Sequence, residues 1–476
     1  MQVPFRLRRA AVLCLGCVVL LTMPAFAQTP APVDVAAQIA ALQRAIETLQ
    51  RELATSHQHT LELETQLRAL RAELDEERDL IQAEASTLDQ TKVESGSKYR
   101  VRLSGLAITH VSMTTGAVDG TDLPLIARAR DEAQPGHTVT ASARQTQVGI
   151  SVFGPEVRGL RTAAEVRFDF FAGFPSAADG LSAAIMRLRT VSLAAEGTTT
   201  SIRAGQEAPF FSPLSPTSVA STAYPALAAA GNLWTWTPQV YVEHRRGVPG
   251  TGQFVLQGGV LDPLTGESPA SEYARQPTAG ERTGWLAPAG RLAWHRQLAG
   301  DRRVSVGGGA FSSNQDWGLG RRINGWALTA DAEVPLGARL TLSGELYRGT
   351  AMGGLGGGAH ASVLFSGPAA LATTRVHALT SRGGWAQLAW RVSPVLRAHI
   401  AGGLDRSHPD AGLGPLTAPD TDVPQAPRNA SAFTNLVWQP RSNLLLSAEY
   451  RRLWTTPLAG PAVTAGHLTF GFGIAF

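Results

Sequence analysis

From about residue 99 to the C-terminus, apolar and polar side chains alternate with a period of two in one segment after another. Segments 161–170, 325–334 and 340–347 each carry one apolar and one polar face. Successive side chains of a β-strand point to opposite faces, so the pattern predicts amphipathic strands. We count sixteen such segments, which begin near Tyr99, Ala141, Arg161, Ala184, Thr199, Trp234, Gln253, Gly290, Arg302, Ile323, Ala338, Arg382, Val395, Asn429, Asn443 and Gly466.

The connections between these segments alternate between short and long. Short ones include 154–160, 196–198, 299–301, 335–337, 393–394 and 440–442, and long ones include 114–140, 208–233, 262–289, 349–381 and 407–428. Outer-membrane barrels have an even number of antiparallel strands, short periplasmic turns and longer extracellular loops. The sequence therefore predicts an all-β transmembrane barrel of about 16 antiparallel strands over 99–476, with both of its ends facing the periplasm.

The last segment supports the same fold independently. Apolar residues from Leu468 to Phe476 alternate with small or polar ones, and the sequence stops on a phenylalanine. A terminal amphipathic strand ending in Phe476 is similar to the signal by which the barrel-assembly machinery recognises its clients, so we expect that machinery and the lipid bilayer of the outer membrane as partners. Six tryptophans near segment ends or on apolar faces are expected to form aromatic girdles: Trp234, Trp236, Trp326, Trp385, Trp390 and Trp438.

The N-terminus is typical of a secreted protein. Residues 1–27 form a predicted signal peptide, with three arginines, a short apolar stretch and an Ala25-Phe26-Ala27 cleavage site. Residues 28–33 are a predicted linker. The only two cysteines, Cys14 and Cys17, lie inside the signal, which excludes disulfides in the mature chain. Beyond the signal there is no run of 18 apolar residues, so no transmembrane helix is expected.

Residues 34–90 follow a heptad pattern without proline or glycine. Isoleucine and leucine recur at the a and d positions, beginning with Ile39 and Leu42, although the seam is weakened at Ser56, Thr60, Glu77 and Glu84. A pattern sustained over this many heptads predicts an α-helical coiled coil, about 85 Å long, that stands in the periplasm. The seam is compatible with two or three strands. Residues 91–98 are a second predicted linker.

The charge of the barrel region indicates what its lumen favours. A barrel of about sixteen strands leaves an aqueous channel. Residues 95–476 carry 33 basic and 25 acidic residues, a net charge of +8, and all the basic residues except Lys98 are arginines. Arginine binds carboxylate or phosphate at two points, and arginine rings favour anion pores. The predicted pore-lining, anion-binding residues are Arg144, Arg167, Arg187, Arg189, Arg203 and Arg397.

A second interpretation makes some of these arginines partners in ordinary lumen ion pairs. Arg167 lies between Glu165 and Asp169 in the sequence, and Arg203 lies close to Glu207. Arg187 and Arg189 are the strongest candidates for solute binding, because no acidic residue lies beside them within 185–193. The segment 207–232 either folds into the barrel as a constriction or caps it from outside, and the sequence leaves both possibilities open.

Several motifs occur in an order that resembles the DcaP-like trimeric outer-membrane porin family. After the predicted coiled coil come Arg144-Gln145-Thr146-Gln147-Val148-Gly149, Ala164-Glu165-Val166-Arg167-Phe168-Asp169-Phe170-Phe171, Met186-Arg187-Leu188-Arg189-Thr190, Arg203-Ala204-Gly205-Gln206 and Pro238-Gln239-Val240. The resemblance implies a homotrimer of barrels, a trimeric periplasmic coiled coil and passage of small anions such as dicarboxylates. The chain departs from the family pattern at Glu207-Ala208-Pro209-Phe210, where a Trp-Ser-x-Phe run is usual.

The sequence thus predicts an outer-membrane porin that passively conducts small hydrophilic solutes and prefers anionic ones such as small carboxylates. An outer-membrane enzyme would need a cluster of serine, histidine and acidic residues, and none occurs at a suggestive spacing. No metal, cofactor or nucleic acid is expected. A third hypothesis is a structural tether, in which the barrel is an anchor and the coiled coil links it to the cell wall.

Overall fold

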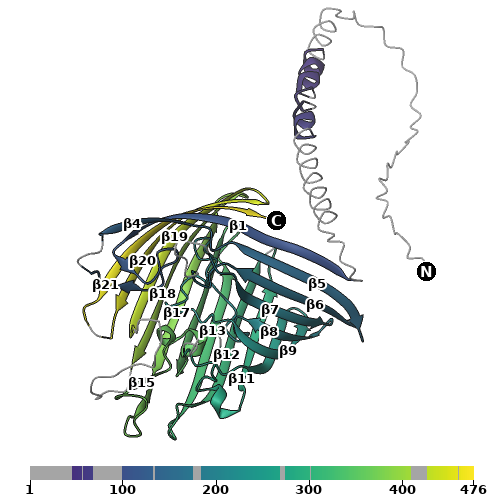
Figure 1. Ribbon diagram of the computed structural model, residues 1–476. Coiled ribbons are helices and arrows are strands. Elements are labelled where there is room, and N and C mark those ends of the chain that lie inside the picture. The colour runs from purple at the N-terminus through teal and green to yellow at the C-terminus, as the bar shows by residue number, and fades with distance from the viewer. Residues whose placement is uncertain are drawn as a thin grey trace, which may run out of the picture. The chain divides into compact units, whose positions relative to one another are not determined.

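The structure is a computed structural model of the chain (Figure 1). It describes residues 46–55, 57–59, 61–67, 99–131, 135–174, 184–267, 274–300, 302–408, 426–458 and 460–476. The chain divides into two units, residues 1–86 and 87–476, which we describe separately. The predicted signal peptide, both predicted linkers and the rest of the predicted coiled coil lie outside the described residues.

The second unit is built from long antiparallel strands. Its wall consists of β1 (Arg100–Thr115), β4 (His137–Ser142), β5 (Gln147–Val157), β6 (Leu160–Asp169), β7 (Arg187–Glu196), β8 (Thr200–Glu207), β9 (Thr237–Val248), β10 (Gly252–Leu261), β11 (Ala287–Gln297), β12 (Arg303–Asp316), β13 (Arg322–Pro335), β14 (Leu340–Thr350), β17 (Thr380–Arg391), β18 (Leu396–His408), β19 (Arg428–Arg441), β20 (Leu444–Thr456) and β21 (Val463–Ala475). Between them lie the short strands β2 (Ala117–Val118), β3 (Ala127–Arg128), β15 (Val363–Phe365) and β16 (Val376–Ala378), and the 3-10 turns η1 (Glu281–Thr283), η2 (Gly353–Leu355) and η3 (Gly358–His360).

These wall strands close into a barrel. Within the described residues the sheet has 17 strands, of which β4 and β5 follow one another along β1 and together occupy one place in the wall. The first and last strands pair, with Leu106 opposite Ala475, so no edge is left open. Closure satisfies the backbone hydrogen bonds of every strand, which a β-structure in lipid requires. The prediction of about sixteen antiparallel strands is confirmed, and each predicted start lies within about four residues of a strand of the wall.

Side chains on the two faces of the wall differ as the alternation predicts. Large apolar side chains such as Leu346 and Ile400, each 64% exposed, project from the outer face. Polar side chains such as Ser431 and Asn435 alternate with them and are buried on the inner face. The outer face therefore suits hydrocarbon, and the inner face can bind segments of chain that enter the barrel.

The six tryptophans divide between the two faces. Trp326, Trp390 and Trp438 are well exposed on the outer face, as expected of a girdle. The girdle prediction is wrong for the other three. Trp385 points inward and packs against a loop inside the barrel, and Trp234 and Trp236 lie in that same loop. Trp234 and Trp236 do lie near the start of β9, and Trp385 lies in the middle of β17, but the long loop that turns inward offers all three a second apolar surface.

The described part of the first unit is helical. Residues 46–55, 57–59 and 61–67 are in α-helix, as the heptads predict. Apolar heptad side chains remain largely exposed along it, with Ile46, Leu49 and Leu53 between 52% and 72% exposed. Across the described segments, the helices are too short or too polar to span a bilayer.

Candidate pore constriction

The loop between β8 and β9, residues 208–236, lies inside the barrel, where it contacts inward-facing residues of successive wall strands. We call it the inward loop. Most of its residues are buried, and its backbone groups pair with inward-facing side chains of the wall. Buried backbone amides and carbonyls need partners when water is excluded. The polar inner face supplies them, and the two alternatives left open for 207–232 are thereby decided in favour of an internal loop.

The inward loop is first anchored near its entry. The backbone amide of Phe210 donates to the Gln239 side chain over 3.2 Å, and the Thr329 hydroxyl donates to the carbonyl of Phe211 over 2.7 Å. The Phe211 ring stacks on Phe311 of β12, with centroids 5.5 Å apart. Apolar packing and hydrogen bonds thus fix the start of the loop against β9, β12 and β13.

The next contacts lie on β14 and β17. The Ser212 hydroxyl donates to the carboxylate of Glu345, which also accepts from the backbone amide of Leu214 at 3.2 Å. The amide of Thr217 donates to the Gln387 side chain over 2.6 Å. Acceptors on the wall here meet successive donors of the loop.

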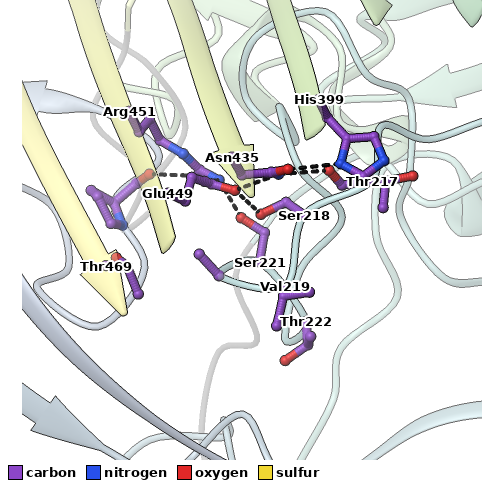
Figure 2. Close-up of polar contacts among 12 residues, drawn as sticks. Thr217, Ser218, Val219, Ser221, Thr222, His399, Asn435, Glu449, Arg451 and Thr469 are labelled. Atoms are coloured by element: carbon purple, nitrogen blue, oxygen red, sulfur yellow. Dashed lines mark hydrogen bonds and ion pairs between the residues drawn. The ribbon is translucent and has the colours of Figure 1, made fainter. Parts of the chain in front are cut away.

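Figure 2 shows the centre of the loop bound to β19 and β20. Asn435 donates to the carbonyl of Thr217 at 3.0 Å and to Glu449 at 3.1 Å. Glu449 also accepts from the Ser218 hydroxyl and from Arg451, whose guanidinium lies 2.8 Å away and donates to Ser221 as well. Both charged side chains are about 3% exposed, so this is a buried ion pair with the loop as its third partner.

The loop then continues along the inner wall, past β21, to β1 and the segment before β5. His110 donates to the carbonyl of Val219 over 3.0 Å. The Gln145 side chain donates to the carbonyl of Ala220 and accepts from the amides of Thr222 and Ala223 at 2.8 and 2.9 Å. Contacts therefore continue along the inner wall from β9 around to the segment before β5, and the inward loop narrows the lumen along this course.

Where the loop leaves this wall, it meets the predicted Arg187. The guanidinium of Arg187 pairs with both carboxylate oxygens of Asp169, at 2.7 and 3.0 Å. It also donates to the Tyr224 hydroxyl at 2.9 Å and to the carbonyl of Ala223 at 2.8 Å. Arg187 thus joins the wall to the loop. No acidic residue lies beside Arg187 within 185–193, but the neighbouring strand supplies one, because Asp169 is its direct partner across β6 and β7.

Arg189 lies one alternation further along β7, at an irregularity of the β6–β7 pairing. A bulge of this kind adds one unpaired residue and redirects its side chain. The Arg189 guanidinium lies over the face of Trp236, 4.8 Å from the ring centroid. Its Nη1 atom is buried without a hydrogen-bond partner among the described residues. Among the arginines around Tyr224 and Trp236, it is the one without a carboxylate partner in the described structure.

Arg144 is a third member of this group. It pairs with Asp122 at 2.7 Å and lies over the rings of Phe171 and Phe174, at 4.3 and 3.9 Å. We call the whole set the arginine–aromatic cluster; it comprises Arg144, Arg187, Arg189, Phe171, Phe174, Tyr224, Trp234 and Trp236. A cavity of about 720 Å³ adjoins it, lined by Asp122, Tyr224 and His360 among others.

The remaining predicted arginines lie apart from the cluster or at its edge. Arg167 pairs with Glu165 at 2.7 Å, as the ion-pair interpretation holds. Arg203 pairs with Glu196 at 2.8 Å, whereas Glu207 was the partner expected. Arg397 lies at an inward-facing position of β18, near the end of the strand that follows a short turn. Its side chain is exposed and has no ion pair among the described residues.

Sequence reasoning missed the groups that hold the inward loop. Glu345, Glu449 and Arg451 lie on strands whose alternation was recognised, but no local pattern marks them as partners of a distant loop. Tyr224 and Trp236 were likewise missed as contacts of the arginines. The signal that could have found them is the run of small and aromatic residues in 208–236, which is apolar enough to be buried.

Comparison with solved structures identifies the fold. The chain is similar to the outer-membrane channel DcaP of Acinetobacter baumannii, at 13% identity over 80% of this chain and 99% of that one, with a TM-score of 0.57. An anion-selective porin from Comamonas acidovorans matches at 14% identity over 80% of this chain and 100% of that one, with a TM-score of 0.49. No protein-family model and no curated protein sequence matches the chain. The chain therefore has a DcaP-like porin fold.

Proposed function

We propose that this chain is a passive channel of the bacterial outer membrane that conducts small hydrophilic solutes and prefers anionic ones, such as small carboxylates. The observation that carries the proposal is the inward loop, which narrows a closed barrel and brings arginines to the narrowed region. A channel needs a water-filled route, and a loop bound along the inner wall narrows that route while leaving the wall intact. The apolar outer face suits a lipid bilayer.

The balance of charge in the cluster supports the anion preference. Arg144, Arg187 and the adjacent Arg167 are each paired with one carboxylate, and these charges cancel locally. Arg189 adds a fourth positive charge without a described acidic partner. A fixed positive charge beside a narrow aqueous path raises the local concentration of anions and lowers that of cations.

We further propose that three copies assemble and that the N-terminal coiled coil, in the periplasm, joins them. The helical residues 46–55, 57–59 and 61–67 carry an apolar stripe that a single chain leaves exposed. Burying Leu49, Leu53 and their heptad equivalents against two further copies would remove this stripe from water. Phe476, exposed at the end of β21, is the proposed contact with the barrel-assembly machinery.

The test is to reconstitute the mature full-length chain in planar bilayers. We expect discrete ion-conducting steps and, in a KCl gradient, a reversal potential with the sign of an anion-selective pore. Folded barrels that insert without conducting would refute the channel, and a cation-selective reversal potential would refute the anion preference.

A further inference from the structure

Four arginines from four adjacent strands lie side by side on the outer face of the barrel. In the register of the sheet, Arg348 of β14 is opposite Arg382 of β17, which is opposite Arg406 of β18, which is opposite Arg428 of β19. Each arginine lies at an outward-facing position of its strand, because the residue next to it in the sequence is buried on the inner face. These buried neighbours are Tyr347, Ser381, Asp405 and Asn429. We call this set the outer arginine row.

The row lies at the edge of the apolar band. Two residues further from the long loops, the same four strands present Leu346, Gly384, Leu404 and Ala430 in one register. Two residues nearer the long loops, Thr350, Thr380 and His408 follow. Since two residues of a strand span about 6.6 Å, the arginines stand where the outer surface changes from apolar to polar.

These like charges lack compensation within the wall. Opposed like charges on neighbouring strands destabilise a sheet. The four strands are described in full, and none of their outward-facing side chains is acidic. Within the described part of the chain, no ion pair involves a member of the row, and the Nε atom of Arg406 is buried without a hydrogen-bond partner. An anion from outside the chain would relieve this repulsion.

The geometry points to a lipid as the source of that anion. Adjacent strands are about 4.8 Å apart, so four arginines span about 14 Å, enough for more than one phosphate group. Guanidinium binds phosphate at two points, and its apolar stem can lie along the hydrocarbon edge. We propose that the outer arginine row binds the phosphates of a phosphorylated glycolipid in the leaflet at the long-loop end. The orientation rests on the proposed outer-membrane location, whereas the binding itself does not require that the pore conduct.

The experiment titrates the purified full-length protein in detergent with diphosphoryl lipid A and follows the bound fraction by native mass spectrometry. The row variant replaces all four arginines with glutamine: R348Q, R382Q, R406Q and R428Q. The matched control removes four positive charges at the short-turn end: R302Q, R303Q, R339Q and R391Q. We expect the row variant to bind at least tenfold more weakly than wild type, and the control to stay within twofold.

Two further arms identify the ligand chemistry. Lipid A stripped of both phosphates should bind wild type as weakly as diphosphoryl lipid A binds the row variant. Inorganic phosphate at 10-fold excess over the lipid should not displace it, because the acyl chains hold the lipid at the apolar band. Equal losses in the row variant and the control, equal binding of the dephosphorylated lipid, or displacement by free phosphate would each overturn the proposal.

Folding and pore function are monitored in the same samples. Circular dichroism and heat-modifiable gel mobility report whether the row variant is folded, and the double variant R382Q/R406Q with its control R302Q/R339Q replaces it if the barrel is lost. The row faces away from the lumen, so the anion preference of the row variant should equal that of wild type. A wild-type protein that conducts with an anion preference but binds diphosphoryl lipid A only weakly would thus refute the proposal for the outer arginine row alone. A wild-type protein that binds the lipid but does not conduct would refute the proposed channel alone.

Discussion

Replacing Arg189 with glutamine tests the electrostatic basis of the proposed anion preference. Glutamine keeps a polar side chain beside Trp236 but removes the one positive charge of the arginine–aromatic cluster that has no described acidic partner. Because the neighbouring arginines remain paired, the substitution makes the cluster locally neutral and leaves its ion pairs in place. The expected result is a weaker preference for anions in a pore of nearly unchanged conductance.

The magnitude follows from Coulomb's law. A unit charge about 4 Å from a passing ion contributes about 1 kcal/mol in water. Screening at about 0.1 M salt reduces this to about 0.7 kcal/mol, and at about 1 M to about 0.3 kcal/mol. The anion concentration beside Arg189 should then fall about threefold at the lower salt concentration and less than twofold at the higher one.

Reversal potentials in KCl gradients measure the change, taken around mean concentrations of about 0.1 M and about 1 M, where the screening lengths differ about threefold. Arg302→Gln, in the turn between β11 and β12, removes one charge away from the lumen and serves as the matched control. An unchanged reversal potential in Arg189→Gln at low salt, or an equal change in the control, would refute the assignment. A shift that does not diminish at high salt would contradict its electrostatic origin.

Four further predictions concern the loop, assembly, insertion and pH. Glu449→Gln leaves Arg451 buried without its carboxylate and weakens the inward loop; unfolding free energy should fall by about 3 kcal/mol in denaturant titrations, and conductance should rise. Leu53→Asp should convert cross-linked oligomers to monomers, while Glu52→Asp, outside the a and d positions, should not. Deleting Phe476 should lower the folded fraction recovered from membranes, measured by heat-modifiable mobility. Burial lowers the pKa of His360 to about 4, below the value of 6.5 in the unfolded chain. The packing of neutral His360 on Trp234 therefore stabilises the inward loop above pH 6.5, and this stabilisation is lost as the pH falls towards 4. Tryptophan fluorescence should detect the change.

The wall of the barrel could be predicted because its signals are local. Each strand shows its two faces within about ten residues, and each turn is marked by a few polar, proline or glycine residues between strands. The pairing of β1 with β21 could also be predicted, because an even number of antiparallel strands lets the first and last strands pair and close the barrel. The interruption between β4 and β5 was not predicted. There residues 143–146 leave the sheet, and the Gln145 side chain binds the inward loop, a contact that no local pattern shows.

The candidate site could be predicted only in part because it depends on register. Alternation places Arg187 and Asp169 on inward faces, but a one-residue bulge decides whether they meet, and the sequence shows no sign of that bulge. The inward path of 208–236 is decided by contacts more than a hundred residues away, such as Thr217 with Gln387. A long loop without charge is equally compatible with a cap, and only its partners distinguish the two.

From the sequence, the net charge of +8 for residues 95–476 was assigned to the lumen as a whole. The register of the strands instead distributes the positive charges between the lumen and the outer face. The outer arginine row places four of these positive charges on the outer face, where they act on the surroundings of the barrel and not on its solutes. Within the lumen, most of the predicted arginines are cancelled by partners such as Asp169 and Glu196. The proposed anion preference therefore depends on a few charges without an ion pair among the described residues, Arg189 and Arg397 foremost. This is why single substitutions there should change selectivity, while the larger charge on the outer face should leave it unaltered.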